Sequence, residues 1–263
     1  MLGKLLKHEF RATARMMLPM LAVLFGLNLL ADASMLLAEH TREGFLAFLL
    51  ALIVGLFFVG VIVAVVMTLV VLTLRFYRNF FGDEGYVTFT LPATVHEQLW
   101  AKLLAALVWF FATMLEIALC FGLMGLTLSL MQGFDFSGIV WDNLREALRQ
   151  FGTLGLDSLF AMLIGTLVML LQLYAAMSLG QMFSKKVLMS VVFFFALNLA
   201  ASILGSAVTV PALFHPVVSP QSYPDAVRLF SHLIRSHTFT QLVFGVALYF
   251  CSVLCLKKRL NLA

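Results

Sequence analysis

Residues 45–74, FLAFLLALIVGLFFVGVIVAVVMTLVVLTL, form an apolar run without a charged side chain, and residues 75–97, RFYRNFFGDEGYVTFTLPATVHE, follow it directly. A helix needs about 20 consecutive apolar residues to cross the hydrocarbon of a bilayer. The run therefore predicts a transmembrane helix that is long enough to tilt or to project beyond the lipid. We expect the charged and turn-forming residues after it to lie at a membrane surface.

The composition of the whole chain indicates an integral membrane protein. Hydrophobic residues make up 62% of the sequence and charged residues 11%, which does not suit a soluble core with a wettable surface. We expect an all-α fold, because a membrane β-barrel would show short alternating strands instead. The apolar segments predict six transmembrane helices in a single transmembrane domain over 1–263, at about 16–37, 45–74, 100–131, 153–180, 187–208 and 238–256.

The distribution of lysine and arginine predicts that both termini are cytoplasmic, since short loops rich in these residues stay on that side. With the N-terminus inside, every lysine lies in the cytoplasm. We therefore expect a multi-pass protein of the cytoplasmic (plasma) membrane. The apolar stretch that reaches Ala31-Asp32-Ala33 resembles a cleavage site, but it continues to Leu37, so we expect no cleaved signal peptide.

Residues 1–15 have the pattern of an amphipathic helix on the inner membrane surface. At 100° per residue, one face carries cations and the opposite face carries Leu2, Leu6, Phe10 and Met17. Each cation near an anionic leaflet contributes about 1 kcal/mol, and the apolar stripe is expected to enter the lipid interface. Glu9 breaks the pattern and is expected to pair with a neighbouring base. The membrane-surface cations are Lys4, Lys7, Arg11 and Arg15.

The region 75–99 is predicted to be a cytoplasmic element that another protein binds. Residues 82–85, GDEG, are a turn signal. Thr94 and Glu97 have the spacing of a capping box, so a new helix should begin near Val95. Between turn and cap, residues 86–91 are too short for a domain and too apolar to remain in water, which favours a pocket on another protein. Their β-branched residues leave open whether they are helical or extended.

These features resemble the permease subunits of type-2 ATP-binding-cassette exporters. Such permeases have six spans, a basic interfacial helix before the first, and a cytoplasmic coupling element between the second and third spans. Their coupling element has an acidic residue, a glycine, a short apolar stretch, a proline and, further on, a lysine. This chain has Glu84, Gly85, residues 86–91, Pro92 and Lys102, and its opening MLGKLLKHEF is also similar.

The resemblance implies further features of fold and partners. The last outer loop, 209–237, is expected to fold back as short re-entrant helices. The 132–152 connection departs from the resemblance, because it is longer than expected of the simplest members. A separate cytoplasmic ATPase and a second permease chain, identical or related, are the implied protein partners. The implied ATPase-coupling residues are Asp83, Glu84, Gly85, Tyr86, Phe89, Leu91, Pro92, Thr94 and Glu97.

The implied function is export of a substrate that the sequence does not identify, such as a peptide, lipid or drug. The sequence contains no G-x-x-x-x-G-K-[ST] loop. ATP and Mg are therefore expected on the partner subunit, with no cofactor and no catalytic residue on this chain. The lipid bilayer is its other partner, and no nucleic acid is expected.

A few polar residues inside the apolar segments are candidates for a translocation path. A charged group at the bilayer centre costs about 2.5–3.5 kcal/mol on insertion scales. The presence of Glu116 inside an apolar segment therefore calls for a structural or functional explanation. One reading places it in a polar path, and the other makes it a protonated or hydrogen-bonded contact between helices. Asp32 and Asp157 lie near span ends and are expected to be solvated. The tentative path residues are Asn28, Glu116, Gln172 and Asn198.

Two alternatives from other classes have weaker support. A membrane-embedded enzyme acting on lipid or peptide would need catalytic or metal-binding groups, but His96-Glu97 lacks the second histidine of a zinc helix. An ion-coupled carrier would need more buried charge and an inverted repeat. The cysteines, Cys120, Cys251 and Cys255, all lie in apolar segments, where they are expected to be packing residues rather than metal ligands.

Overall fold

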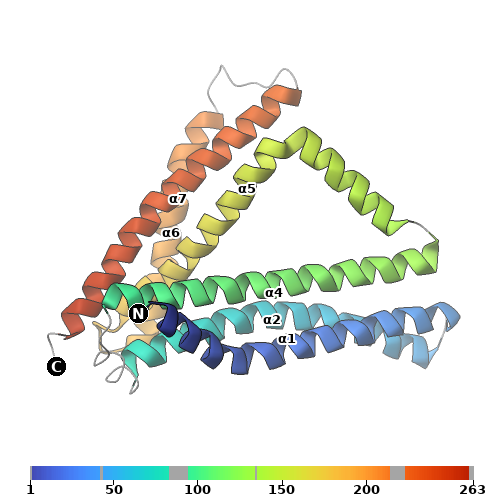
Figure 1. Cartoon of the computed structure of the whole chain (residues 1–263), viewed down its shortest axis with the longest axis horizontal. Helices are drawn as coiled ribbons and strands as arrows, with labels where there is room; N and C mark the ends of the chain where they lie inside the picture. The colour runs from blue at the N-terminus through green and yellow to red at the C-terminus, as the bar shows by residue number, and fades with distance from the viewer. Residues whose placement is uncertain (1, 42–43, 83–93, 134, 214–222, 261–263) are drawn as a thin grey trace. The chain divides into compact units, whose positions relative to one another are not determined.

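The computed structural model describes residues 2–41, 44–82, 94–133, 135–213 and 223–260, and every regular element in these ranges is a helix (Figure 1). This confirms the expected all-α class for the described part of the chain. The helices are α1 (Leu2–His40), α2 (Phe45–Phe81), α4 (Val95–Gln132), α5 (Phe136–Gly180), α6 (Lys186–Leu213) and α7 (Tyr223–Leu260).

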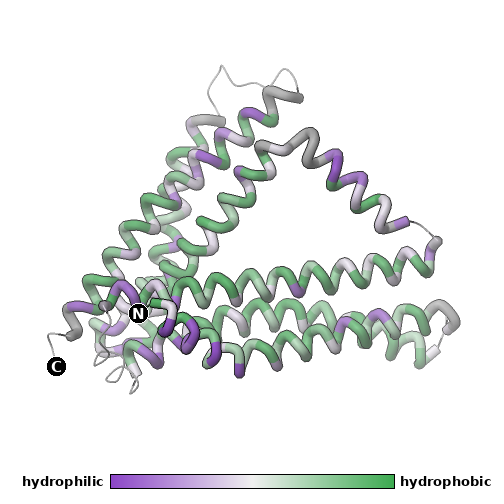
Figure 2. Tube along the Cα trace, viewed as in Figure 1, coloured by the Kyte–Doolittle hydropathy of each residue, from purple (hydrophilic) through white to green (hydrophobic). Residues whose placement is uncertain are grey.

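Within the described residues, six helices are long and apolar enough to cross a membrane, as predicted. Figure 2 shows that hydrophobic residues dominate most of their length, with hydrophilic residues gathered towards some of the ends. The chain is a polytopic membrane protein. The side of the membrane on which each end lies stays a prediction. The candidate spans are Leu2–Ala38, Phe45–Phe81, Val95–Gln132, Leu154–Gly180, Lys186–Pro211 and Val227–Lys257.

The first helix differs from the sequence expectation. Residues 1–15 were expected to form their own interfacial helix, but α1 is continuous from Leu2 to His40 and has Pro19 inside it. Nothing in this stretch forces a break, because a proline costs one backbone hydrogen bond and bends a helix without necessarily ending it.

The fourth and sixth expected spans also begin earlier as helices. The helix α5 starts at Phe136, and α7 starts at Tyr223. Within the expected re-entrant loop 209–237, residues 209–213 complete α6 and residues 223–237 open α7, while 214–222 lie outside the described residues. Hydropathy marks where a chain leaves the lipid, but a helix can continue through polar residues beyond that point.

Within the chain that we expected to form one transmembrane domain, the contacts define two compact units. The N-terminal unit contains residues 3–75 and 104–144. The C-terminal unit contains residues 76–103 and 145–263, together with residues 1–2.

The N-terminal unit packs parts of α1, α2 and α4 together. Its core includes Leu24 and Ala31 of α1, Phe57 and Ala64 of α2, and Cys120 of α4. The apolar stripe near the N-terminus contacts protein rather than only lipid, since the Phe10 ring lies 6.2 Å from that of Trp109 and Met17 is fully buried. The membrane-surface cations Lys4, Lys7, Arg11 and Arg15 are all exposed.

Glu9 pairs with a base on another helix. Its Oε2 accepts a hydrogen bond from Nε of Arg75 at 2.8 Å, and the side chains are 13% and 25% exposed. Arg75 belongs to α2, so the pair joins two helices instead of neighbouring turns of one. The acid that interrupts the cationic face of α1 therefore fixes the start of α1 to the last turns of α2.

The C-terminal unit brings α6 and α7 side by side, and α5 contacts both of them. A Cβ on Gly180 would lie 2.6 Å from the backbone nitrogen of Ser190, where α5 ends beside the first turns of α6. A Cβ on Gly245 would lie 2.8 Å from Cγ2 of Val168, where α7 crosses α5. Glycine at these positions allows the close helix contacts that are typical of membrane bundles.

Candidate functional site

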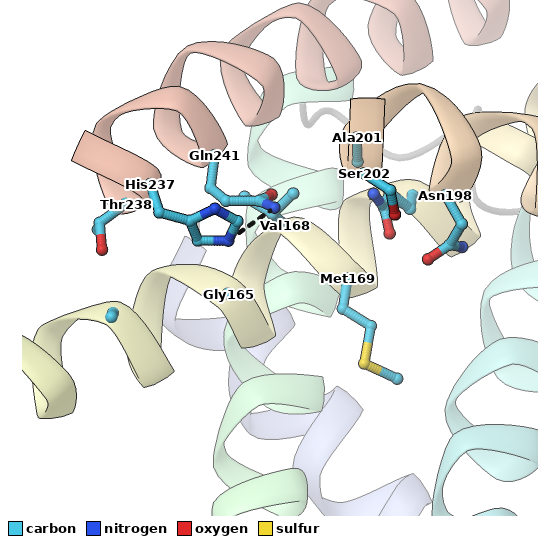
Figure 3. Close-up of a pocket in the computed structure, with 11 residues that line it drawn as sticks. Gly165, Val168, Met169, Asn198, Ala201, Ser202, His237, Thr238 and Gln241 are labelled. Atoms are coloured by element: carbon cyan, nitrogen blue, oxygen red, sulfur yellow. Dashed lines mark hydrogen bonds between the residues drawn. The ribbon is translucent and has the colours of Figure 1, made fainter. Parts of the chain in front are cut away.

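A pocket of about 310 Å³ lies between α5, α6 and α7 in the C-terminal unit (Figure 3). Its lining residues fall inside three candidate spans rather than at their ends. Polar side chains are uncommon at such positions, since lipid offers them no hydrogen bonds. The pocket is lined by Ala161, Gly165, Val168, Met169, Gln172, Asn198, Ala201, Ser202, His237, Thr238 and Gln241.

The polar side chains of the pocket come from all three helices. In Figure 3, His237 and Gln241 project from α7, with the His237 Nε2 and Gln241 Nε2 atoms 3.5 Å apart. Asn198 of α6 donates through Nδ2 to the carbonyl of Phe194 at 3.0 Å within its own helix. A 3.5 Å separation is long for a hydrogen bond. The His237 imidazole and the Gln241 amide therefore interact only weakly with each other.

Two glycines shape the pocket. A Cβ at Gly165 would have no atom within 4 Å, so α5 leaves open space there. At Gly205 of α6, a Cβ would lie 2.9 Å from Cε1 of His237. Any larger residue at 205 would push the imidazole, and glycine therefore lets the His237 ring lie against the α6 backbone.

The structure brings together two of the four predicted path residues. Gln172, which is 5% exposed, and Asn198 both line the pocket. Asn28 and Glu116 belong instead to the N-terminal unit, where Asn28 donates through Nδ2 to the carbonyl of Cys120 at 3.2 Å. The four residues therefore divide into two pairs, each within its own unit.

Sequence reasoning missed the pocket residues of α7. The last span was expected to begin at residue 238, which placed His237 in an outer loop, whereas the candidate span begins at Val227. Gln241 and Ser202 were visible as polar residues within apolar segments and carried the same signal as Gln172. An earlier helix start would have placed His237 and Gln241 one turn apart on the same face.

The predicted capping box is confirmed. The backbone N–H of Thr94 donates to Oε2 of Glu97 at 3.0 Å, and the N–H of Glu97 donates to Oγ1 of Thr94 at 3.2 Å. The helix α4 begins at Val95, as expected. The other predicted coupling residues lie outside the described residues, namely Asp83, Glu84, Gly85, Tyr86, Phe89, Leu91 and Pro92.

The helix ends that flank residues 82–94 pack on the same helices that form the pocket. At the end of α2, the Phe76 ring stacks on Tyr174 of α5 with centroids 3.9 Å apart. At the start of α4, His96 Nδ1 lies 2.7 Å from the Tyr249 hydroxyl of α7, and the Trp100 ring is 5.8 Å from the Tyr249 ring. Both sides of the predicted coupling region are therefore attached to pocket helices.

The α2 and α4 ends also contact each other. The Lys102 ammonium of α4 lies 5.2 Å from the centroid of the Phe80 ring of α2. Lys102 is 7% exposed, and a cation over an aromatic face is stabilised more strongly when it is removed from water. The lysine on which part of the family resemblance rests thus holds the two flanks together.

Asp157 is paired rather than simply solvated. Its carboxylate accepts hydrogen bonds from Nε of Arg235 at 2.8 and 2.9 Å and from the hydroxyl of Ser231. The pair joins α5 to α7, with Asp157 about one turn before the pocket residue Ala161 and Arg235 two residues before the pocket residue His237. This contact fixes the relative placement of two of the three pocket helices.

No group of three or more His, Cys, Asp or Glu side chains in the described ranges could hold a metal ion. Comparisons with protein-family models, with curated proteins and with solved structures give no match for this chain.

Proposed function

We propose that this chain is the membrane-spanning permease subunit of an ATP-binding-cassette exporter. A separate cytoplasmic ATPase docks on residues 83–97 and hydrolyses ATP with Mg, and the permease moves a peptide, lipid or drug across the cytoplasmic membrane. A second permease chain, identical or related, matches the second ATPase of such assemblies. The observation that carries the proposal is the attachment of both flanks of the docking region to the pocket helices.

Helix length supports a docking region outside the lipid. The helices α2 and α4 have 37 and 38 residues. At 1.5 Å per residue each is about 55 Å long, whereas the hydrocarbon of a bilayer is about 30 Å thick. Tilt takes up part of the difference, and the remainder projects from the membrane. The segment that joins these helices is then accessible to a soluble partner.

The packing of the α2 and α4 ends would transmit movement of residues 82–94 to the pocket helices. Movement of residues 82–94 would act on Tyr174 through Phe76 and on Tyr249 through His96. Tyr174 lies two residues after Gln172 in α5, and Tyr249 lies about two turns after Gln241 in α7. Because packed helices move as rigid elements, displacement of either tyrosine changes the pocket. ATPase closure would in this way alternate the access of the pocket between the two sides.

The pocket chemistry favours a substrate with neutral polar groups. Its polar lining consists of amides, hydroxyls and one imidazole, and contains no Asp, Glu, Lys or Arg. Amide and hydroxyl side chains can both donate and accept hydrogen bonds. The surrounding alanine, valine and methionine side chains suit an apolar portion of the substrate. We therefore infer that the pocket accepts the polar part of an amphipathic substrate during export.

Co-purification from native membranes tests the docking assignment. The triple variant Glu84→Ala, Tyr86→Ala and Phe89→Ala should lose an ATPase that accompanies the unchanged chain. The matched control is the triple variant Ile139→Ala, Trp141→Ala and Asp142→Asn, which alters exposed apolar, aromatic and acidic side chains of α5. Equal recovery of the ATPase with both triple variants would refute docking at this region.

A further inference from the structure

The first part of α5 is amphipathic ahead of its candidate span. Residues 136–151 read FSGIVWDNLREALRQF. At 100° per residue, Val140, Trp141 and Leu144 fall within one sector of about 100°. The apolar letters at 147, 148 and 151 repeat the same spacing in the sequence. We call residues 136–153 the α5 arm, and Val140, Trp141 and Leu144 its apolar stripe.

The apolar stripe is exposed along its length. Trp141 is 64% exposed, and Val140 and Leu144 are also exposed. Apolar surface is stabilised by removal from water, so a stripe of this kind is disfavoured on a helix that water surrounds. The other sides of the arm carry exposed charges of both signs, including Asp142 and Arg145. This pattern indicates a helix at the boundary between an apolar phase and water.

Both ends of the arm lie at the same membrane surface. The helix α4 is apolar as far as Met131 and ends at Gln132, and only residues 133–135 separate it from α5. At its other end, the arm is joined directly to the candidate span that begins at Leu154. Two consecutive spans leave and re-enter a membrane on the same side. The arm therefore begins and ends at one surface, whichever side that is.

The length of the arm makes it run along that surface rather than away from it. At 1.5 Å per residue the arm is about 27 Å long. A projecting arm would place its start about that far from the lipid, whereas the chain from Gln132 to Phe136 spans at most about 14 Å. Figure 1 shows that α5 bends ahead of its pocket-lining part. Gly152 and Gly155 lie at the start of the span, where glycine weakens the helix and permits such a bend.

We propose that the α5 arm binds the lipid interface of the membrane through its apolar stripe, with its charged sides in water. Trp141 suits this position, because tryptophan is enriched where acyl chains meet head groups. The bilayer that covers the adjoining span also buries the stripe, so no further partner is needed. Because the exposed charges have both signs, binding does not depend on anionic lipid. The proposal is independent of export, since it depends only on the arm and its two ends.

Tryptophan fluorescence of the purified full chain in phosphatidylcholine vesicles tests the proposal. The emission of Trp141 is the difference between the unchanged chain and Trp141→Phe, because Trp100 and Trp109 remain in both. We expect lipids brominated near the head group to quench this emission more strongly than lipids brominated deep in the acyl chains. Iodide on both sides of the membrane should quench it only weakly.

Two glutamate variants separate the apolar stripe from the other sides of the arm. Leu144→Glu places a charge in the stripe, and it should increase the quenching of Trp141 by iodide and reduce the quenching by brominated lipid. Ile139→Glu is the matched control, since Ile139 is also an exposed aliphatic residue of the arm but lies outside the stripe. It should leave both kinds of quenching near their original values. The Trp141 emission of each variant is obtained by the same subtraction.

Each alternative arrangement gives a different result that would overturn the proposal. Strong quenching by iodide in the unchanged chain would show that the arm lies in water. Protection of Trp141 from both iodide and brominated lipid would show that a second copy or another protein covers the stripe. Stronger quenching by the deep bromines would place the arm inside the hydrocarbon. Equal responses of Leu144→Glu and Ile139→Glu would show that the stripe does not determine the placement. The measurements on the unchanged chain decide the question even where Leu144→Glu fails to fold.

Discussion

The rings of Phe76 and Tyr174 are stacked, with centroids 3.9 Å apart and planes within 7°. The side chains are 1% and 2% exposed, and they join the end of α2 to α5 within the C-terminal unit. The contact links a helix that leads into the predicted docking region to a helix that lines the pocket. The contact can be tested by measuring the stability of variants. Its loss should also affect the coupling between the docking region and the pocket.

Phe76→Ala should destabilise the chain by about 3–5 kcal/mol, because it leaves a cavity in a fully packed core. Phe76→Leu retains most of the buried volume and should cost less, while losing the ring contact. The measurement is the apparent midpoint of thermal unfolding in detergent. A double-mutant cycle with Tyr174→Leu should show a coupling of about 0.5–1.5 kcal/mol for the aromatic pair. Strict additivity would mean that the stacking contributes nothing.

The capping box provides a second test. Thr94→Ala removes a side-chain acceptor at the start of α4 and should cost about 1 kcal/mol of helix stability. Thr94→Ser keeps the hydroxyl and serves as the matched control. Hydrogen exchange of the first turn of α4 should accelerate in Thr94→Ala and remain near the original rate in Thr94→Ser. Equal exchange in both variants would show that the hydroxyl does not hold this end.

The cap was predictable from sequence because it is local, since Thr94 and Glu97 are three residues apart and their pairing needs only a helix start. The six spans were predictable because length and hydropathy determine them. By contrast, the partners of Glu9 and Phe76 depend on how helices cross, and spacing along one helix does not contain that information. His237 was missed for a different reason, because the last span was expected to begin at residue 238, whereas the helix α7 begins at Tyr223.

The ion pairs Glu9–Arg75 and Asp157–Arg235 should respond differently when their carboxylates are neutralised. Glu9 and Arg75 are 13% and 25% exposed, and Glu9→Gln leaves the arginine without its charged partner in a partly buried position. We expect a loss of about 1–3 kcal/mol, the range for hydrogen bonds to charged groups. Arg235 is 64% exposed, so Asp157→Asn should have the smaller effect because water screens that pair. Unfolding midpoints measured in parallel show which variant loses more stability. A larger loss for Asp157→Asn than for Glu9→Gln would contradict the structure.

Asp135 immediately precedes α5 and accepts hydrogen bonds from its first turn, which gives a prediction on pH. The backbone N–H of Gly138 and the hydroxyl of Ser137 donate to Oδ1 at 2.8 and 2.7 Å, and these bonds lower the pKa of Asp135 below its ordinary value. Because the folded-state pKa is lowered, ionised Asp135 stabilises the first turn of α5 at pH values above its unfolded-state pKa, about 3.9. This stabilisation is lost as the pH falls through the folded-state pKa.

Titration of the Asp135 carboxyl followed by NMR should therefore have a midpoint below that of an unstructured aspartate. Ser137→Ala should raise the midpoint, whereas Ser158→Ala, which removes a hydroxyl further along α5, should not. A midpoint that Ser137→Ala leaves unchanged would show that the hydroxyl does not stabilise the carboxylate.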